Sequence, residues 1–469
     1  MHNIPQKAPL VAALAAMRAR TSFHMPGHKG RAELLPLDAA FDVTELPVTD
    51  DLYAASGPIA AAQRLAARSA RAAATVLLTN GSTCGVQAML GYAARPGQRV
   101  ILPRACHLSA VSACALYGLE PVWVESMADD GGAPFTPVEA LVRAVQDAPD
   151  AACVLVTRPD YYGRMPALEP LAWAVHASGM LLLVDEAHGA HLNWLGAGQL
   201  WRHEPDMGVS ALDAGADICV QSAHKTLNAL TGGAFLNCAA GIDLERLLRC
   251  VALTQSSSPS FLIMASLDAA RQYMDERGAA ELERISGLCE RLNARCAAWD
   301  LAPAREWFGQ TCDTTRLALD VTARGITGHE ALAALAARGI DVELADPRRI
   351  VLISTVADRA EDFERLERGL AELPRGESGF TAPRIARVPR GERICSVREA
   401  VLGATERVPL ARARGRVAAR ALGVYPPGVP LCVPGELISH ELAAMLADAQ
   451  HAGASLFGLE QGMCVVTRE

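Results

Sequence analysis

The chain has 469 residues, more than one ordinary hydrophobic core takes, and this length predicts two domains preceded by a short N-terminal arm. Hydrophobic residues make up 51% of the chain and charged residues 20%, a balance that excludes a disordered protein. The net charge of −8 argues against a nucleic-acid partner. No apolar run approaches the roughly 18 residues of a membrane helix, so we expect no membrane partner.

The N-terminal stretch 8–17 faintly resembles a signal sequence. It lacks a cationic start and a small-residue cleavage site, and Arg18 and Arg20 follow it, so an amphipathic helix is the better interpretation. The thirteen cysteines form no Cys-x-x-Cys pair and no cluster with histidine. We therefore expect free thiols, a cytoplasmic location and no metal site.

Short apolar runs alternate with helical patterns between residues 75 and 238. Several runs are nearly continuous Val, Leu and Ile, as expected for strands that are covered on both faces. This alternation predicts an α/β fold with a mainly parallel seven-stranded sheet, in which ligands bind at the carboxyl ends of the strands. The predicted strands are 76–79, 100–102, 121–124, 153–157, 181–185, 218–222 and 234–237, and the helices between them include 84–93, 137–147 and 168–178.

The chain becomes rich in helical patterns after residue 262 and then carries a second region with strand patterns. Proline, glycine and arginine gather at 374–389, which is typical of a connector. The later elements are predicted as helices 268–278 and 281–298 and strands 315–321 and 349–355. We expect an arm over 1–20, a major domain over 21–285 and a smaller α+β C-terminal domain over 286–469.

An aspartate and a lysine stand where two predicted strands end. Asp185 closes the apolar run 181–184, where a carboxylate is expensive to bury unless it meets a cation. Lys225 follows the strand 218–222, and a lysine amine can form an imine with an aldehyde. Alone, the aspartate would be a turn cap and the lysine a surface residue. Together they predict catalysis with pyridoxal 5′-phosphate (PLP), whose protonated ring nitrogen and aldehyde need these two partners.

The residues between the first predicted strand and its helix are candidates for binding the cofactor phosphate. A helix N-terminus with free backbone amides and hydroxyl groups binds phosphate, which makes Ser82 and Thr83 candidate ligands. An ordinary helix cap uses the same residue types, so the pattern is weak by itself. Ser222 and His224, beside the lysine, are further candidates for phosphate contacts.

Three more residues stand near the predicted strand ends. Ala187 is small enough to lie flat under a cofactor ring. His188 either forms a hydrogen bond near the cofactor or has a structural role, and the sequence leaves both open. His107 follows another strand end, where an imidazole can stack on a ring, but a lone loop histidine is more often structural.

The order of these motifs resembles that of the bacterial ornithine/lysine/arginine decarboxylase family, whose members are fold-type I PLP enzymes. The similar stretches span almost the whole chain, which excludes chance similarity. They are FHMPGHK (23–29), TELPVTDDL (44–52), LTNGST (78–83), DEAHGAH (185–191), QSAHKTL (221–227), QSSSPS (255–260), YPPGVP (425–430) and PGE (434–436).

The resemblance implies the fold-type I PLP-dependent transferase-like architecture, with a PLP-binding major domain, in a short form without an N-terminal wing domain. It implies that Lys225 attaches the cofactor, that Asp185 holds the pyridine nitrogen and that His107 stacks on the ring. Phosphate contacts would come from Ser82, Thr83, Ser222 and His224. The resemblance also implies a homodimer or a higher homo-oligomer, and it makes Ser258 and Glu436 candidates for shaping the substrate site.

The sequence departs from the family pattern next to the site. Ala105 and Leu108 stand beside His107 where the family usually has asparagine and lysine, and Ala223 replaces a frequent threonine. The resemblance predicts decarboxylation of lysine, ornithine or arginine to the amine and CO2, an activity of polyamine metabolism. Another fold-type I reaction, aminotransfer or β-elimination, and a non-catalytic paralogue are the alternatives.

Overall fold

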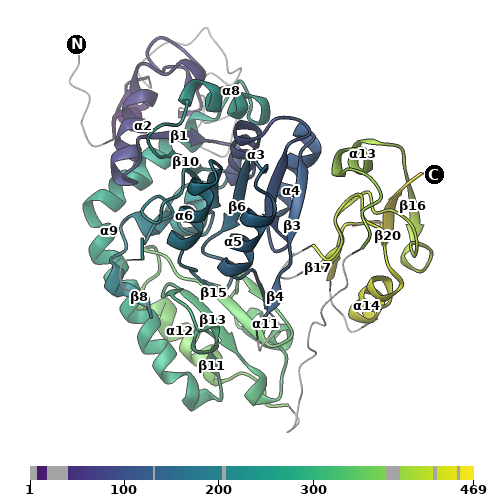
Figure 1. Cartoon of the computed structure of the whole chain (residues 1–469). Coiled ribbons are helices and arrows are strands. Elements are labelled where there is room, and N and C mark those ends of the chain that lie inside the picture. Colours follow the sequence, from purple (N-terminus) through teal and green to yellow (C-terminus); the bar gives the residue numbers. More distant parts are fainter. Residues whose placement is uncertain are drawn as a thin grey trace.

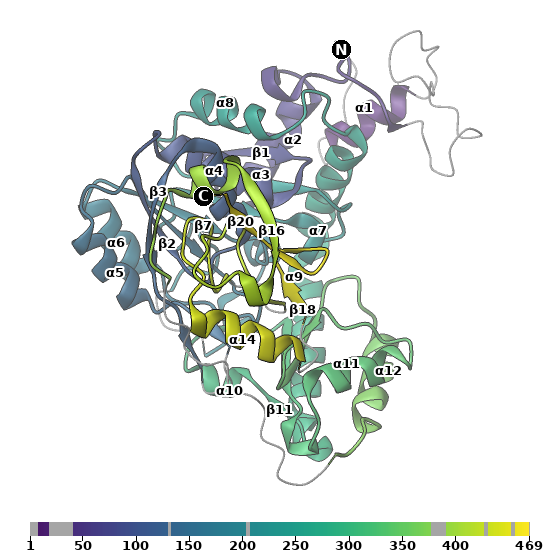
Figure 2. The ribbon, with the colours of Figure 1, turned by 90° about the vertical axis from the view of Figure 1, so that its right-hand side faces the viewer.

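The computed structural model describes residues 8–17, 41–129, 133–202, 207–376, 391–425, 430–451 and 455–468. The similar stretch 23–29, most of 425–430 and most of the expected connector at 374–389 lie outside the described residues. Figures 1 and 2 show a large α/β body with the C-terminal segment, residues 391–468, beside it. No described helix is long and apolar enough to span a bilayer.

A seven-stranded sheet forms the centre of the large body (Figure 1). Strand β10 pairs antiparallel with β1 and β9, and the other neighbouring strands pair in parallel. The predicted mainly parallel sheet of seven strands is therefore confirmed. In spatial order the strands are β1 (Ala74–Leu78), β10 (Ala234–Cys238), β9 (Ile218–Gln221), β7 (Leu181–Asp185), β6 (Cys153–Thr157), β2 (Arg99–Pro103) and β3 (Glu120–Val124).

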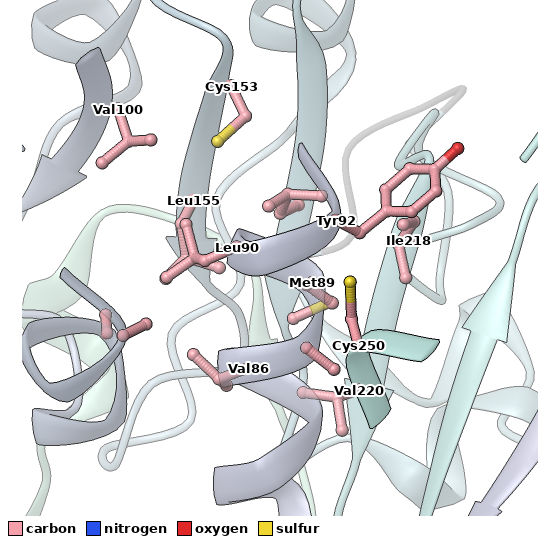
Figure 3. Close-up of a cluster of buried hydrophobic side chains, with 14 of the residues drawn as sticks. Val86, Met89, Leu90, Tyr92, Val100, Cys153, Leu155, Ile218, Val220 and Cys250 are labelled. Atoms are coloured by element: carbon pink, nitrogen blue, oxygen red, sulfur yellow. The ribbon is translucent and has the colours of Figure 1, made fainter. Parts of the chain in front are cut away.

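Helices cover both faces of this sheet because successive strand residues point to opposite sides. Leu155 of β6 packs in the core under one helical layer, whereas Val154 and Val156 pack under the other. Figure 3 shows side chains of α3 within the first of these cores. The first layer contains α3 (Gly81–Ala93), α4 (Leu108–Tyr117) and α8 (Leu244–Thr254), and the second contains α5 (Val138–Asp147) and α6 (Glu169–Ala177).

A third core joins the N-terminal helices to the long helix α9 (Phe261–Arg295). It includes α1 (Pro9–Met17) and α2 (Pro58–Ser69), so the stretch expected as an N-terminal helix is helical. The sequence predicted two helices, 268–278 and 281–298, where the structure has one. Gly278, the end of the first predicted helix, lies inside α9 and packs closely, because a β-carbon there would lie 2.9 Å from Met274 Cε and 3.4 Å from Trp194 Cβ.

A second sheet packs against the C-terminal half of α9, with Ile285 and Leu292 of that helix in the shared core. Residue 285, the expected domain boundary, lies inside this helix, and the division into domains stays a prediction. The sheet contains β11 (Ala302–Pro303), β13 (Arg316–Asp320), β15 (Arg349–Ile353) and β14 (Leu344–Ala345), with helices α11 (Gly328–Ala336) and α12 (Ala360–Ala371).

The C-terminal segment has its own hydrophobic core. Arg398 connects it to the major body, because its Nη1 donates to the carbonyls of Ala115 and Leu116 at the end of α4, at 3.0 and 2.7 Å. Figure 2 shows this segment in front of the central sheet. Its elements include α13 (Val397–Leu402), β16 (Thr405–Pro409), β17 (Gly423–Tyr425), α14 (His440–His451), β18 (Ser455–Phe457), β19 (Leu459–Glu460) and β20 (Met463–Thr467).

Helix α3 approaches the sheet closely at Gly85, where a β-carbon would lie 2.5 Å from Val220 Cγ2 and 2.8 Å from Leu78 Cδ1. We predict that Gly85→Ala lowers the free energy of unfolding by about 1–3 kcal/mol, because the core must shift to admit a methyl group. The matched control is Gly287→Ala in α9, where the nearest atom is the flexible end of Arg291. That change should raise the free energy of unfolding by about 0.5–1 kcal/mol. Chemical denaturation measures both, and equal effects would contradict the tight contact.

Candidate active site

A cavity of about 430 Å³ opens at the carboxyl ends of the central strands. Ligands of open α/β sheets bind at this edge. The strand ends in its wall are Thr79 after β1, Pro103 of β2, Thr157 of β6, Asp185 of β7 and Ser222 after β9. The fold thus gathers residues that are more than a hundred positions apart in the sequence.

Most of the predicted site residues line this cavity. They are Ser82, Thr83, His107, Asp185, Ala187, His188, Ser222, His224 and Lys225. The two candidate substrate residues, Ser258 and Glu436, are not part of its wall.

Lys225 lies in the short helix α7 (Ala223–Thr226) that follows β9. Its Nζ atom is 3.2 Å from Nε2 of His188. Burial lowers the pKa of the amine and Arg316 lowers it further, while Asp185 opposes them. A lowered pKa favours the uncharged amine, which is the nucleophilic form of lysine.

The chain contains only three lysines, Lys7, Lys29 and Lys225. Lys225 is the one that falls within the described residues. The scarcity of lysine is a sequence signal that the motif-based prediction did not use. It limits the side chains that could attach an aldehyde covalently.

His188 connects the lysine to a part of the chain that the sequence did not implicate. Its Nδ1 atom lies 3.2 Å from Nη2 of Arg316 in β13, and its ring lies 4.8 Å from the ring of Tyr161. Burial lowers the pKa of His188 well below its usual value, and the charges of Arg316 and Lys225 lower it further. The imidazole is therefore neutral near pH 7.

Asp185 is buried, with 5% of its surface exposed, and its Oδ1 accepts a hydrogen bond from the amide of Ala187 at 3.2 Å. Thr157 pairs with Asp185 across β6 and β7. Thr157 lines the cavity, and its hydroxyl is buried with no hydrogen-bond partner among the described residues. Asp185 also lines the cavity, and a buried carboxylate needs a cation or hydrogen-bond donors as partners. The residues present therefore fit a polar aromatic ring with a cationic nitrogen, as PLP has.

The hydroxyl groups expected at the phosphate lie together. Ser222 Oγ donates to Ser82 Oγ at 2.8 Å, which brings the end of β9 to the start of α3. Helix α3 begins at Gly81, whose φ of +73° favours glycine. Ser82 and Thr83 in the first turn of this helix line the cavity, and the first amides of a helix have no acceptor within the helix, as anion binding requires.

His224 has its hydrogen-bonding roles fixed by the backbone. Its Nδ1 atom lies 3.0 Å from the carbonyl oxygen of Gly233, so Nδ1 carries a proton and donates it. The neutral ring then presents an acceptor at Nε2. His224 can donate to a phosphate from Nε2 only in its protonated form.

His107 caps helix α4, and its Nδ1 accepts from the amide of Ser109 at 3.2 Å. This bond holds the ring beside the cavity. His107 is exposed, yet desolvation by the surrounding protein lowers the pKa of its ring, with Asp185 opposing and Lys225 assisting. A neutral, oriented imidazole suits the predicted stacking role.

Glu436 forms a buried ion pair with Arg104, which directly precedes the loop that carries His107. Oε1 and Oε2 of the carboxylate each lie 2.9 Å from an Arg104 nitrogen, and Glu436 is 2% exposed. The C-terminal segment is therefore bound to the His107 loop. Ser258 is exposed in the loop between α8 and α9. The substrate roles of Glu436 and Ser258 stay predictions.

The carboxylate next to the catalytic candidate Asp185 is also buried. Glu186 is 0% exposed and accepts from Gln221 Nε2 and the Ala211 amide, both at 2.7 Å. Its Oε1 lies 3.9 Å from Nη1 of Arg158. Burial raises the pKa of the Glu186 carboxyl to about 7, with Arg158 and Gln221 opposing.

Two family models match the chain: "Orn/Lys/Arg decarboxylase, major domain" over residues 8–304 and "Orn/Lys/Arg decarboxylase, C-terminal domain" over residues 392–464. The arginine decarboxylase of Bacillus subtilis is 30% identical over 95% of this chain and 94% of its own length. The arginine decarboxylase of Halalkalibacterium halodurans is 30% identical over 97% of this chain and 96% of its own length.

The constitutive lysine decarboxylase of Escherichia coli is more distant. It is 23% identical over 88% of this chain and 70% of its own length. Its solved structure superposes with a TM-score of 0.82 at 19% identity, over 99% of this chain and 82% of that chain. This likeness bears out the predicted fold class.

The raised pKa of Glu186 predicts a pH-dependent stability. Between about pH 4.5 and 7 the folded protein keeps the Glu186 proton and the unfolded chain loses it, so the free energy of unfolding falls as the pH rises. Glu186→Gln removes this contribution, and the variant should gain on the order of 3 kcal/mol relative to wild type across the window.

Urea unfolding at pH 5 and pH 7.5 measures this difference. Glu139→Gln, an exposed change at the start of α5, is the control and should leave the pH dependence unaltered. If the free energy of unfolding changed with pH equally in Glu186→Gln and wild type, Glu186 would be ionised in the folded protein over this whole pH range.

Proposed function

The chain belongs to the Orn/Lys/Arg decarboxylase family, as its motifs predict, and we propose that arginine is the amino acid it converts, to agmatine and CO2. Family membership makes the protein a PLP-dependent decarboxylase of a basic amino acid. The two arginine decarboxylases match nearly their whole lengths at 30% identity, and the lysine decarboxylase matches 70% of its length at 23%. Membership favours decarboxylation over the aminotransferase, β-elimination and non-catalytic alternatives.

The observation that carries the site assignment is the convergence of Lys225, Asp185 and His107 on one cavity. When bound there, PLP supplies an electron-accepting ring that stabilises the negative charge left on the α-carbon as CO2 departs. We assign the covalent attachment to Lys225, whose lowered pKa leaves the amine nucleophilic. Asp185 holds the ring nitrogen in its protonated form.

We assign roles in cofactor binding to the remaining residues of the cavity wall. Ser82, Thr83 and Ser222 bind the phosphate at the start of α3, with His224 adding a contact when it is protonated. Ala187 leaves room for the ring, and His107 stacks on it.

We propose a homodimer or a higher homo-oligomer as the working form. Among the described residues of the cavity wall, the carboxylates are Asp160, which pairs with Arg164, and Asp185, which is assigned to the ring nitrogen, so neither is left for a substrate guanidinium. Acceptors for that group must therefore lie elsewhere around the opening. Ser258 is exposed, and a second subunit would allow its loop to face a neighbouring cavity.

We place the protein in the cytoplasm. All thirteen cysteines are unpaired thiols, and twelve of them are buried. Free thiols persist in a reducing compartment.

The arginine assignment predicts the product of a substrate panel. With arginine, lysine and ornithine supplied separately to the PLP-loaded protein, agmatine should form with kcat/KM at least about tenfold above cadaverine or putrescine formation, because a site built for guanidinium leaves polar groups unpaired with an amine. Liquid chromatography of the amines measures this. Preferred formation of cadaverine or putrescine would move the assignment to lysine or ornithine, and a keto-acid product would contradict decarboxylation.

Lys225→Ala should lose both turnover and the visible absorbance of the attached cofactor, because no other described lysine can form the link. Borohydride treatment followed by peptide mass spectrometry should place the fixed cofactor on Lys225 in the wild-type protein. Lys7→Arg is the matched control and should keep the label and the activity. If the cofactor were fixed to Lys7 or Lys29, or retained in Lys225→Ala, the assignment of Lys225 as the attachment residue would be wrong.

A further inference from the structure

We propose that Arg316 is a positioning residue that fixes the tautomer of His188, so that the ring presents an N–H group to Lys225 and stabilises the lysine as an uncharged amine. The proposal deepens the proposed function and rests on Lys225 as the attachment residue. It assigns a role in the site to a residue of the second sheet, 91 positions away from the lysine in the sequence.

The first step concerns which nitrogen of His188 carries the proton. Nη2 of Arg316 lies 3.2 Å from Nδ1 of His188. A guanidinium has only donors, and although burial lowers the pKa of Arg316, the group keeps its proton at physiological pH. Nδ1 must therefore accept with its lone pair. The single proton of the neutral imidazole then resides on Nε2.

The second step concerns the lysine. Nε2 of His188, which carries this proton, faces Nζ of Lys225 at 3.2 Å. A charged ammonium group has three donors and no acceptor, so it would meet the N–H of His188 donor to donor. The uncharged amine has a lone pair and accepts this hydrogen bond. The contact thus selects the form of Lys225 that attacks an aldehyde.

The charges around Lys225 act in the same direction on balance. Burial is the largest cause of its lowered pKa; Arg316 lowers it further, and Asp185 and Glu343 oppose. Burial is the largest cause of the lowered pKa of His188, and the Arg316 guanidinium lowers it further.

Arg316 is built into a tight position. It is 4% exposed and pairs with Ile353 within the second sheet. Gly163 lies against its side chain with a φ of +87°, and a β-carbon there would come within 2.7 Å of the Arg316 Cβ atom. Nη1 of Arg316 also lies 3.5 Å from the Tyr161 carbonyl oxygen. The loop 160–164 and strand β13 therefore hold the guanidinium against His188.

The small number of lysines makes the protonation state of Lys225 directly measurable without cofactor or substrate. Apoprotein labelled with ¹³C at the lysine ε-carbon should give three lysine signals, and the signal missing from Lys225→Ala belongs to Lys225. In wild type its titration midpoint should lie below the usual value of about 10.4. Arg316→Met should raise this midpoint by about one pH unit and slow cofactor attachment at pH 7 about tenfold.

Two controls separate the tautomer effect from a loss of fold or a loss of charge. Arg305→Gln removes another buried arginine of the second-sheet region, one that pairs with Glu290, and should leave the Lys225 midpoint unchanged. Arg316→Lys keeps the charge with a different donor geometry and should give a smaller shift than Arg316→Met. In a His188→Gln background the Arg316→Met shift should shrink, because only the through-space charge effect remains.

A ¹⁵N spectrum of histidine-labelled wild-type apoprotein tests the same idea without any variant at Arg316. His188, identified by its loss in His188→Gln, should show a proton on Nε2 and none on Nδ1. A proton on Nδ1, or equal Arg316→Met shifts with and without His188, would overturn the inference. Neither result would touch the proposed function, which fails instead if Lys225→Ala still attaches the cofactor.

Discussion

The parallel pairing of β6, β7 and β9 is the constraint on which the site depends. Thr157 pairs with Asp185 in this ladder, and Asp185 pairs with Val220, two residues before Ser222. Since parallel strands end at the same edge, Thr157 and the buried carboxylate of Asp185 emerge together there, and the lysine helix begins beside them. A shift of one residue in any of these strands would turn the side chain at its end to the opposite face.

The same sheet supplies the low-polarity surroundings that alter the chemistry of Lys225. Apolar side chains alternate between two helical layers, so the strands are covered on both faces. An ammonium group loses more by leaving water than an uncharged amine does, which is why burial is the first cause of the lowered pKa of Lys225. The packing that stabilises the fold therefore also prepares the nucleophile.

The sequence predicted those parts of the site that follow a local rule. Asp185 and Lys225 each stand after a continuous apolar run, and a polar residue at the end of a buried strand is visible without knowing what lies opposite. Arg316 gave no such signal, because it begins an ordinary strand pattern and meets His188 only through tertiary packing. Glu436 shows the same limit: the family resemblance made it a candidate for the substrate site, and its partner Arg104 lies 332 positions away in the sequence. The sequence predicted two helices in place of the single helix α9, and Gly278, where the first was expected to end, lies inside α9 against Met274 and Trp194.

Two buried arginines connect the cavity wall to the rest of the molecule. Arg104 ties the His107 loop to the C-terminal segment through Glu436, and Arg316 ties His188 to the second sheet. A guanidinium deprived of its partner in such a place is an uncompensated buried charge, which costs about 3–5 kcal/mol. Breaking the contacts that hold His107 and His188 in place would therefore be strongly destabilising. The end of a strand fixes the position of a residue's backbone, and a partner from another element fixes the orientation of its side chain. The side chains around Lys225 and Asp185 are therefore oriented by contacts from outside the central sheet.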